Sequence, residues 1–108
     1  MPKTKLLPTK NPKLKAILVG VNISNQNDHL SLEDSIEELE RLADSAGVEV
    51  LGIVTQNLNR QNPKTFIGSG KVEEVKILAE ELGSDLIIFD NELSPRHQRE
   101  LEMAFGIS

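Results

Sequence analysis

Three short apolar runs alternate along this chain with three amphipathic segments, and this alternation restricts the fold more than any other feature of the sequence. The runs at 16–21, 48–55 and 86–89 have the length and composition of buried strands. Each run is followed by a segment with apolar residues at helical spacing. Alternating strands and helices predict parallel strands joined by right-handed crossovers. We therefore expect an α/β domain with an open, mostly parallel sheet of three to four strands and helices on its faces.

The predicted helices carry recognisable start and stop signals. Ser31 and Ser94 are the predicted N-caps of the first and third helices, and Gly47 is predicted to end the first. The second helix is predicted to run over about 70–82. The inner faces of the first two helices are predicted to comprise Leu32, Ile36, Leu39, Leu42, Ala43 and Ala46, and Val72, Val75, Leu78, Ala79 and Leu82.

The net charge of −5 is unevenly distributed along the chain. Residues 1–15 contain five lysines and no acidic residue, whereas residues 16–108 contain seven basic and 17 acidic residues. We expect 1–15 to be a basic, flexible N-terminal arm and 16–108 to be a single domain. A basic arm on an acidic domain indicates that any contact with RNA would use the arm or a local patch. A plain leader is the alternative interpretation of the arm.

The composition also excludes several classes of protein. The chain has no cysteine, which removes disulfides, thiolate zinc sites and thiol nucleophiles. No apolar run approaches the roughly 20 residues of a membrane span. The N-terminus lacks the apolar core of a signal peptide. We expect a soluble, cytoplasmic protein that does not contact membranes.

The Gly-rich stretch at 65–74, at the start of the second predicted helix, looks at first like a phosphate-binding loop. A P-loop ending on Gly70 and Lys71 would need glycine at Thr65 and a hydroxyl at Val72, and the chain has neither. The stretch is therefore not a P-loop.

A dinucleotide-binding fingerprint that started at Gly68 would need a small residue at the position of Glu73. Two interpretations remain. In the first, the free N–H groups of the helix start hold an anion with help from Lys71. In the second, Ser69 caps the helix and the glycines allow a tight turn.

Other polar residues follow the predicted strands, at the sheet edge where open α/β proteins bind ligands. Asp90 and Glu92 could hold a metal or act as an acid–base pair, but the chain supplies no matching ligand or nucleophile, so we expect no metal site. His29 and His97 are not spaced like ligands and are predicted to be solvated. Phe89 is predicted to lie in the core.

Five basic residues could form a surface for phosphate groups. Arg96 and Arg99 fall in the first turns of the third helix, where positive charge opposes the helix dipole. Arg60, Lys64 and Lys71 would extend the surface. With three aromatic residues in the chain, the sequence favours binding to an RNA backbone over reading of bases. A solvated helix face is the alternative.

Several motifs occur in a fixed order after the arm. They are Ala16-Ile17-Leu18-Val19-Gly20-Val21, Ala46-Gly47, Gln56, Pro63-x-Thr65-x-Ile67-Gly68-x-Gly70-Lys71-x-Glu73-Glu74, Phe89-Asp90-x-Glu92-Leu93-Ser94-Pro95 and Gln98-Arg99-x-Leu101-Glu102. Together they resemble the N-terminal domain of the HflX family of ribosome-associated GTPases. The resemblance covers nearly everything after the arm and is most specific in the fourth and fifth motifs.

The resemblance implies a non-catalytic domain that precedes a helical segment and a GTPase domain, neither of which is in this chain. Family members bind the large ribosomal subunit and are associated with dissociating stalled or stress-inactivated ribosomes. Their N-terminal region contributes to this binding and tunes the GTPase domain. For this chain the resemblance implies contact with rRNA and a GTPase domain through Arg60, Lys64, Lys71, Arg96 and Arg99. GTP and Mg²⁺ are expected only for the absent domain, and this chain is expected to need no cofactor.

Adenine-nucleotide binding has also been attributed to the N-terminal region of the family, which leaves a second function open. ATP phosphates would then lie on Gly68, Ser69, Gly70 and Lys71. Two positions depart from the family pattern: Leu58, predicted to lie in a loop, stands where Arg is frequent, and Glu100 replaces a usual Asn. The missing loop charge argues against rRNA contact at that position.

The alternation ends after the third helix, where a further strand would be expected. One edge of the sheet is therefore predicted to be missing or supplied by a partner. Pairing of two such edges would give a homodimer.

Overall fold

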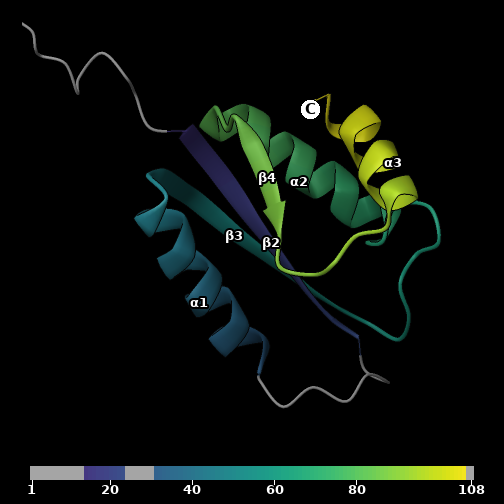
Figure 1. Cartoon of the computed structure of the whole chain (residues 1–108). Helices are drawn as coiled ribbons and strands as arrows, with labels where there is room; N and C mark the ends of the chain where they lie inside the picture. The colour runs from purple at the N-terminus through teal and green to yellow at the C-terminus, as the bar shows by residue number, and fades with distance from the viewer. Residues whose placement is uncertain (1–13, 24–30, 107–108) are drawn as a thin grey trace, which may run out of the picture.

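The computed structural model describes residues 14–23 and 31–106, which form one three-stranded sheet and three helices (Figure 1). The predicted alternation of strands and helices is confirmed. In chain order the elements are β2 (Leu14–Ile23), α1 (Leu32–Ser45), β3 (Val48–Leu58), α2 (Ser69–Leu82), β4 (Leu86–Phe89) and α3 (Pro95–Phe105). β2 includes Leu14 and Lys15, which were predicted to belong to the arm. No helix in the described part of the chain is long and apolar enough to cross a membrane.

The sheet has the order β3-β2-β4, and both pairings are parallel. β2 is central and pairs with β3 over nearly its whole length, whereas β4 pairs only with the four residues Ala16 to Val19. α1 packs on one face, against β2 and β3. α2 packs on the other face, and α3 packs against α2 (Figure 1). The predicted open parallel sheet with helices on its faces is therefore confirmed.

The central strand is buried on both faces, as its continuous apolar run predicts. Ile17, Val19 and Val21 belong to the core cluster under α2 and α3. The intervening residues face α1, where Gly20 allows a close approach: a Cβ at Gly20 would lie 2.6 Å from Cδ1 of Ile36. The missing side chain at this position lets α1 lie directly on the sheet.

Several predicted boundaries and faces are wrong. β3 continues to Leu58, which was predicted to lie in a loop but packs against the core. Leu42 is 57% exposed and Leu82 is 42% exposed, although both were predicted on inner faces. Leu42 lies about 100° around the helix axis from Ala43, and α1 contacts only two strands, so its apolar stripe is wider than the surface it covers.

β4 was predicted to be a buried strand, and this is also wrong, because all four of its residues are only half-buried. β4 is an edge strand, and α1 makes no substantial contact with it. Phe89 packs against the core cluster but keeps part of its surface exposed.

Candidate functional site

Because the three strands are parallel, their carboxyl ends lie at one edge of the sheet, which we call the carboxyl edge. The connection from β3 to α2 (59–68) and the connection from β4 to α3 (90–94) both begin there. These connections and the helix turns after them contain every residue that the sequence proposes for a site. The segment after β2, which includes His29, lies outside the described residues.

The β3–α2 connection is closed by a compact turn. The N–H and C=O groups of Asn62 and Phe66 exchange two hydrogen bonds of 2.9 Å. The side-chain oxygen of Asn62 accepts hydrogen bonds from the N–H groups of Lys64 (2.8 Å) and Thr65 (3.2 Å). The N–H of Ile67 donates to the Thr65 carbonyl at 2.7 Å, which makes Phe66 the centre of a γ-turn. The hydrogen bonds of this turn are thus made within the turn itself.

Phe66 has φ = 69°, a conformation that costs a non-glycine residue about 1–2 kcal/mol. Burial offsets this cost, because Phe66 is 4% exposed and the following Ile67 is fully buried. The prediction that the glycines supply the turn is wrong: Gly68 has φ = −65°, and Gly70 is not among the positive-φ residues. The turn therefore drives two apolar side chains into the core.

The start of α2 also differs from the prediction that Ser69 caps it. Gly68 is the N-cap residue, Ser69 is the first helical residue, and no side chain caps the helix. The N–H of Gly68 donates to Oε1 of Gln56 at 3.3 Å, so the end of β3 holds the turn in place. Gly70 has no neighbour within 4 Å of an added Cβ, so packing does not require glycine there.

The two candidate lysines each lie beside a carboxylate. Nζ of Lys71 is 3.0 Å from Oε1 of Glu74, and Nζ of Lys64 is 3.9 Å from Oε1 of Glu100. Lys64 and Ser69 border a groove of about 520 Å³ that is also lined by Glu73 and Glu100. A phosphate group placed there would meet two carboxylates as well as one ammonium.

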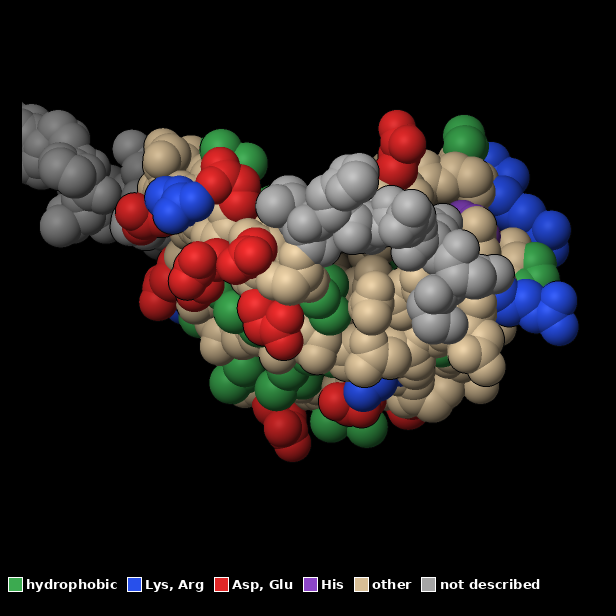
Figure 2. Space-filling model, turned by 90° about the horizontal axis from the view of Figure 1, so that it is seen from below, with side chains coloured by type: hydrophobic (Ala, Val, Ile, Leu, Met, Phe, Trp, Pro, Cys, Tyr) green, Lys and Arg blue, Asp and Glu red, His purple; other side chains and the backbone are tan. Residues whose placement is uncertain are grey.

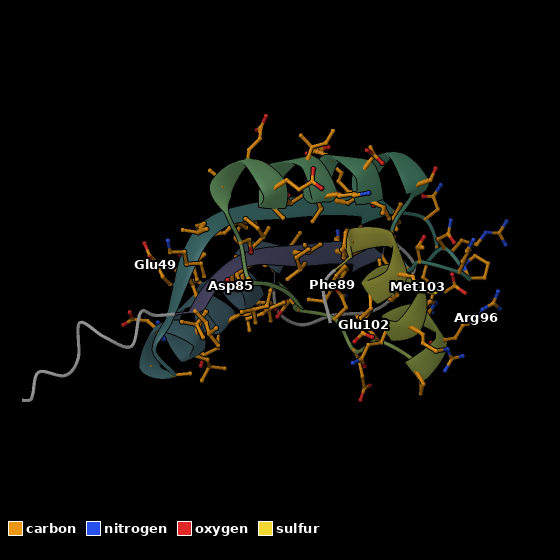
Figure 3. All side chains as sticks on the ribbon, turned by 90° about the horizontal axis from the view of Figure 1, so that it is seen from above. Glu49, Asp85, Phe89, Arg96, Glu102 and Met103 are labelled. Atoms are coloured by element: carbon orange, nitrogen blue, oxygen red, sulfur yellow. The ribbon has the colours of Figure 1, made fainter. Side chains whose placement is uncertain are left out.

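The three candidate arginines are different. Arg60, Arg96 and Arg99 are exposed, and none forms an ion pair with another residue that the structure describes. We call these three residues the arginine end. Figure 2 shows a cluster of Lys and Arg side chains at one end of the molecule, beside a histidine, with most of the acidic side chains on this face toward the other end. In Figure 3 Arg96 lies at the end of the molecule far from Glu49 and Asp85.

His97, in the first turn of α3, contacts the β3–α2 connection, and the prediction that it is solvated is wrong. It is 8% exposed, and its ring meets that of Phe66 edge-on, with centroids 5.4 Å apart and planes at 74°. Its Nδ1 is buried and has no hydrogen-bond partner among the described residues. Helical phase could have revealed this, since His97, Leu101 and Phe105 recur every four residues and are the buried residues of α3. The contact holds the β3–α2 connection, which carries Arg60, against α3, which carries Arg96 and Arg99.

The start of α3 agrees with its prediction. Oγ of Ser94 accepts a hydrogen bond from the N–H of His97 at 3.1 Å, and Pro95 is in the first turn. This cap satisfies one N–H group of the helix start and fixes the backbone that carries Arg96 and Arg99.

The crevice between the carboxyl ends of β2 and β4, where this topology would bind a ligand, contains a protein side chain. The amide of Asn91 accepts from the N–H of Val21 at 2.9 Å and donates to its carbonyl at 3.0 Å. The N–H of Asp90 donates to the Val19 carbonyl, and partial burial raises the pKa of the Asp90 carboxyl. Among the described residues no group of three or more His, Asp or Glu side chains could hold a metal ion.

Comparisons with known proteins agree with the resemblance seen in the motifs. The family model described as GTP-binding GTPase N-terminal matches residues 33–108. The chain is similar to the GTPase HflX of Flavobacterium psychrophilum, with 41% identity over 87 residues that cover 81% of this chain and 21% of that protein. Identity to the Escherichia coli GTPase HflX is 36% over 88 residues, covering 82% and 20%.

A third relative gives a similar result. The GTPase HflX of Thermococcus kodakarensis is 44% identical over 77 residues, which cover 71% of this chain and 16% of that protein. The chain thus spans about a fifth of the length of the relatives it matches.

Proposed function

The chain belongs to the HflX family of GTPases and corresponds to their N-terminal domain, and from this membership we propose that it is a non-catalytic module that binds the large ribosomal subunit in the cytoplasm. In this proposal it also regulates the GTPase domain and so takes part in ribosome dissociation. GTP and Mg²⁺ belong to that other domain.

The observation that carries the proposal is the arginine end. Its three guanidinium groups lie on two elements that the Phe66–His97 contact holds together, and no described carboxylate pairs with them. Guanidinium groups bind phosphate oxygens in a bidentate manner. The rest of the domain is acidic, so a phosphate backbone would be attracted at this end and repelled elsewhere.

Cosedimentation with large ribosomal subunits over a salt series tests the proposal. Each arginine–phosphate contact contributes roughly 0.7 to 0.9 to the slope of log affinity against log salt concentration. The triple variant Arg60→Ala, Arg96→Ala, Arg99→Ala should therefore reduce the slope by roughly two to three. Lys71→Ala is the matched control and should leave the slope nearly unchanged, because Lys71 already pairs with Glu74. Deletion of residues 1–13 measures the contribution of the lysines there.

Equal slopes for the unmodified chain and the triple variant would contradict a role for the arginine end. Absence of binding even at low salt would contradict the proposal that this domain binds the large subunit.

ATP binding at the Gly68–Lys71 turn is the second candidate function. Two observations favour it. Neither packing nor backbone conformation requires a glycine at Gly70, and no described side chain caps α2. If ATP binds there, Lys71→Ala and Gly70→Ala should both weaken binding in a calorimetric titration while leaving the melting temperature nearly unchanged. Heats identical to dilution for the unmodified chain would exclude this function.

A further inference from the structure

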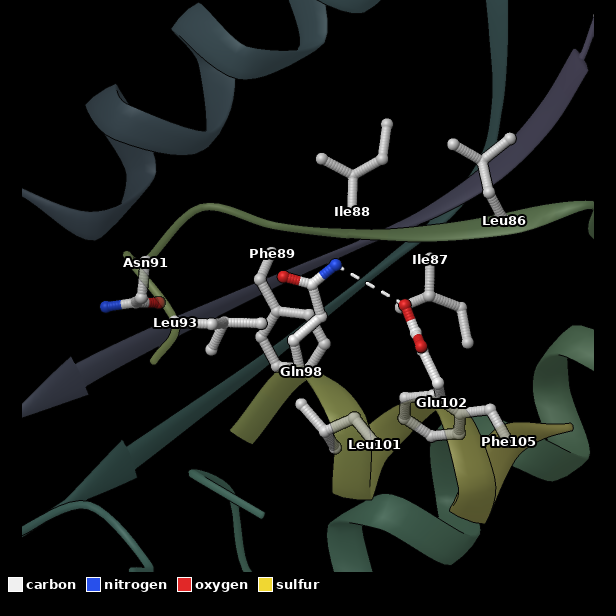
Figure 4. A pocket seen from close by; sticks show the side chains of 10 residues that line it. All are labelled: Leu86, Ile87, Ile88, Phe89, Asn91, Leu93, Gln98, Leu101, Glu102 and Phe105. Atoms are coloured by element: carbon white, nitrogen blue, oxygen red, sulfur yellow. Dashed lines mark hydrogen bonds between the residues drawn. The ribbon is translucent and has the colours of Figure 1, made fainter. Parts of the chain in front are cut away.

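The sheet has a groove beside each of its edges, and the two grooves differ in charge. The groove beside β4 has a volume of about 430 Å³ and lies between the sheet and α3. Figure 4 shows that most of the side chains that line it are apolar. Its one carboxylate, that of Glu102, accepts a hydrogen bond from Nε2 of Gln98 at 3.3 Å. A cationic ligand would therefore find no carboxylate without a partner in this groove.

The groove beside β3 is acidic. It has a volume of about 290 Å³ and lies between α1 and β3, the other edge strand. We call it the acidic groove, and its lining residues are Leu32, Glu33, Ile36, Glu37, Glu40, Ile53 and Thr55. The three glutamates are exposed, and none forms an ion pair with another residue that the structure describes. Ile53 is 42% exposed, so the groove also presents apolar surface.

The glutamates form a stripe along α1, because they recur every three or four residues. Asp44 continues the stripe in the last turn of the helix, which contains no basic residue. Carboxylates at this spacing repel one another, and a negative charge in the last turn opposes the helix dipole. Cations in the acidic groove would relieve both effects.

We propose that residues 1–13 of this chain dock in the acidic groove as an extended segment. The segment contains four lysines and no acidic residue, and Leu6 and Leu7 lie between its two pairs of lysines. In this arrangement the ammonium groups pair with the glutamates, and the leucines cover Ile53. A docked segment cannot give its lysines to RNA, so the acidic groove and a phosphate backbone compete for them.

The spacing of the charges supports this occupant. Lys3 and Lys5 would lie about 7 Å apart in an extended chain. Glu33 and Glu37 are separated by about 6 Å along the axis of α1. Neighbouring lysines of an extended segment can therefore face neighbouring carboxylates of the stripe.

The segment also starts in a suitable place. Leu14, the residue after it, pairs with Val48 at the start of β3, and α1 ends nearby at Ser45. Thr55 lies further along β3, at a distance of about 23 Å from Val48. An extended chain of the length of residues 1–13 spans up to about 43 Å. The segment can therefore reverse its direction and still follow the whole groove.

The covalent connection favours this occupant over a separate basic peptide. A short linker gives an effective concentration in the millimolar range. A contact with a dissociation constant of about 1 mM would then keep the segment docked for about half of the time. A separate peptide at micromolar concentration would leave the same site almost empty.

The test uses a spin label, which broadens the NMR signals of nearby amides. The chain has no cysteine, so Thr4→Cys gives a single labelling site in the full chain. The label should reduce the amide signals of Glu37 and Thr55 at least about twofold more than that of Val75, which belongs to the helix on the other face of the sheet. A segment that did not dock would sample both faces and affect them alike.

Two variants separate the acidic groove from acidic surface in general. The triple variant Glu33→Gln, Glu37→Gln, Glu40→Gln should remove the difference between the two faces. The matched control removes the same charge from exposed positions of α2 and should leave the difference intact; it is Glu73→Gln, Glu80→Gln, Glu81→Gln. About 1 M salt, at which the Debye length is about 3 Å, should weaken the difference in the chain with the unmodified groove.

Equal broadening on the two faces, or a difference that survives the triple variant of α1, would overturn the proposal. Broadening of the same size in a mixture of isotopically labelled chain without the spin label and spin-labelled chain without isotope would also overturn it, by identifying the segment of a second copy as the occupant. No ribosome is used, so this test and that of the proposed function succeed or fail separately.

Discussion

The two connections at the carboxyl edge both lead from a strand into a helix, but they start that helix in different ways. The β3–α2 connection carries Gly68 and the strained Phe66, and the helix after it starts without a side-chain cap. The β4–α3 connection is short, and Ser94 caps its helix. The lysines of the first connection and of the helix start after it lie beside carboxylates, whereas the arginines that follow the second are free of described ion pairs.

The difference teaches that resemblance to a phosphate loop and availability of positive charge are separate properties. The Gly-rich stretch looks like an anion site in sequence, yet most of its hydrogen bonds are internal and serve to bury Phe66 and Ile67. The capped start of α3 has no glycine signature but presents exposed arginines. The following predictions test this contrast, from the largest expected effect to the smallest.

Removal of the Phe66 ring should have the largest effect. Phe66→Ala should lower the free energy of unfolding by about 3 kcal/mol, because it leaves a cavity in the core and keeps the positive φ. Phe66→Gly should be about 1 kcal/mol more stable than Phe66→Ala, because glycine adopts this φ without strain. Urea denaturation measures both.

Phe105 provides the control for this comparison, because it is similarly buried but ends a helix. There the order should reverse, with Phe105→Gly less stable than Phe105→Ala. The same order at both positions would show that the turn at Phe66 is not strained.

The helix starts should respond unequally to loss of a hydroxyl. Ser94→Ala should lower stability by about 1 kcal/mol, because it removes the acceptor of the His97 N–H. Ser69→Ala should change stability by no more than a few tenths of a kcal/mol, because Ser69 is exposed and is not the N-cap. Thermal denaturation compares the two variants. Equal losses of stability would indicate that Ser69 acts as a cap after all.

The smallest effect should come from Asp90 and depend on pH. Burial raises the pKa of the folded carboxyl above 3.8, so its ionised form is disfavoured in the fold. The favourable contribution of the protonated form is complete below the unfolded pKa and is lost as pH rises through the folded pKa. Asp90→Asn should therefore be slightly more stable than the unmodified chain at neutral pH, and this advantage should shrink in acid. A stability difference between the two proteins that stays the same at neutral and acid pH would contradict this expectation.

Much of this architecture could be predicted because it rests on local patterns. Apolar runs and helical spacing gave the order of elements, and Ser31 and Ser94 were correctly identified as caps. The exposure of Leu42 could not be predicted from helical spacing, because it depends on which element packs against α1. The burial of His97 could have been predicted, because His97 lies four residues before the apolar Leu101. The positive φ at Phe66 was missed because a bulky residue rarely adopts that conformation.

Asn91 has a consequence for how the sheet is aligned. A strand of four residues has few contacts to fix its register, and a shift by one residue would exchange the faces of all its side chains. The Asn91 amide and the main chain of Val21 form two hydrogen bonds, and only one alignment of β4 with β2 allows both. The register of any further strand that paired with the outer side of β4 would therefore also depend on this one side chain, which bonds to β2 on the inner side.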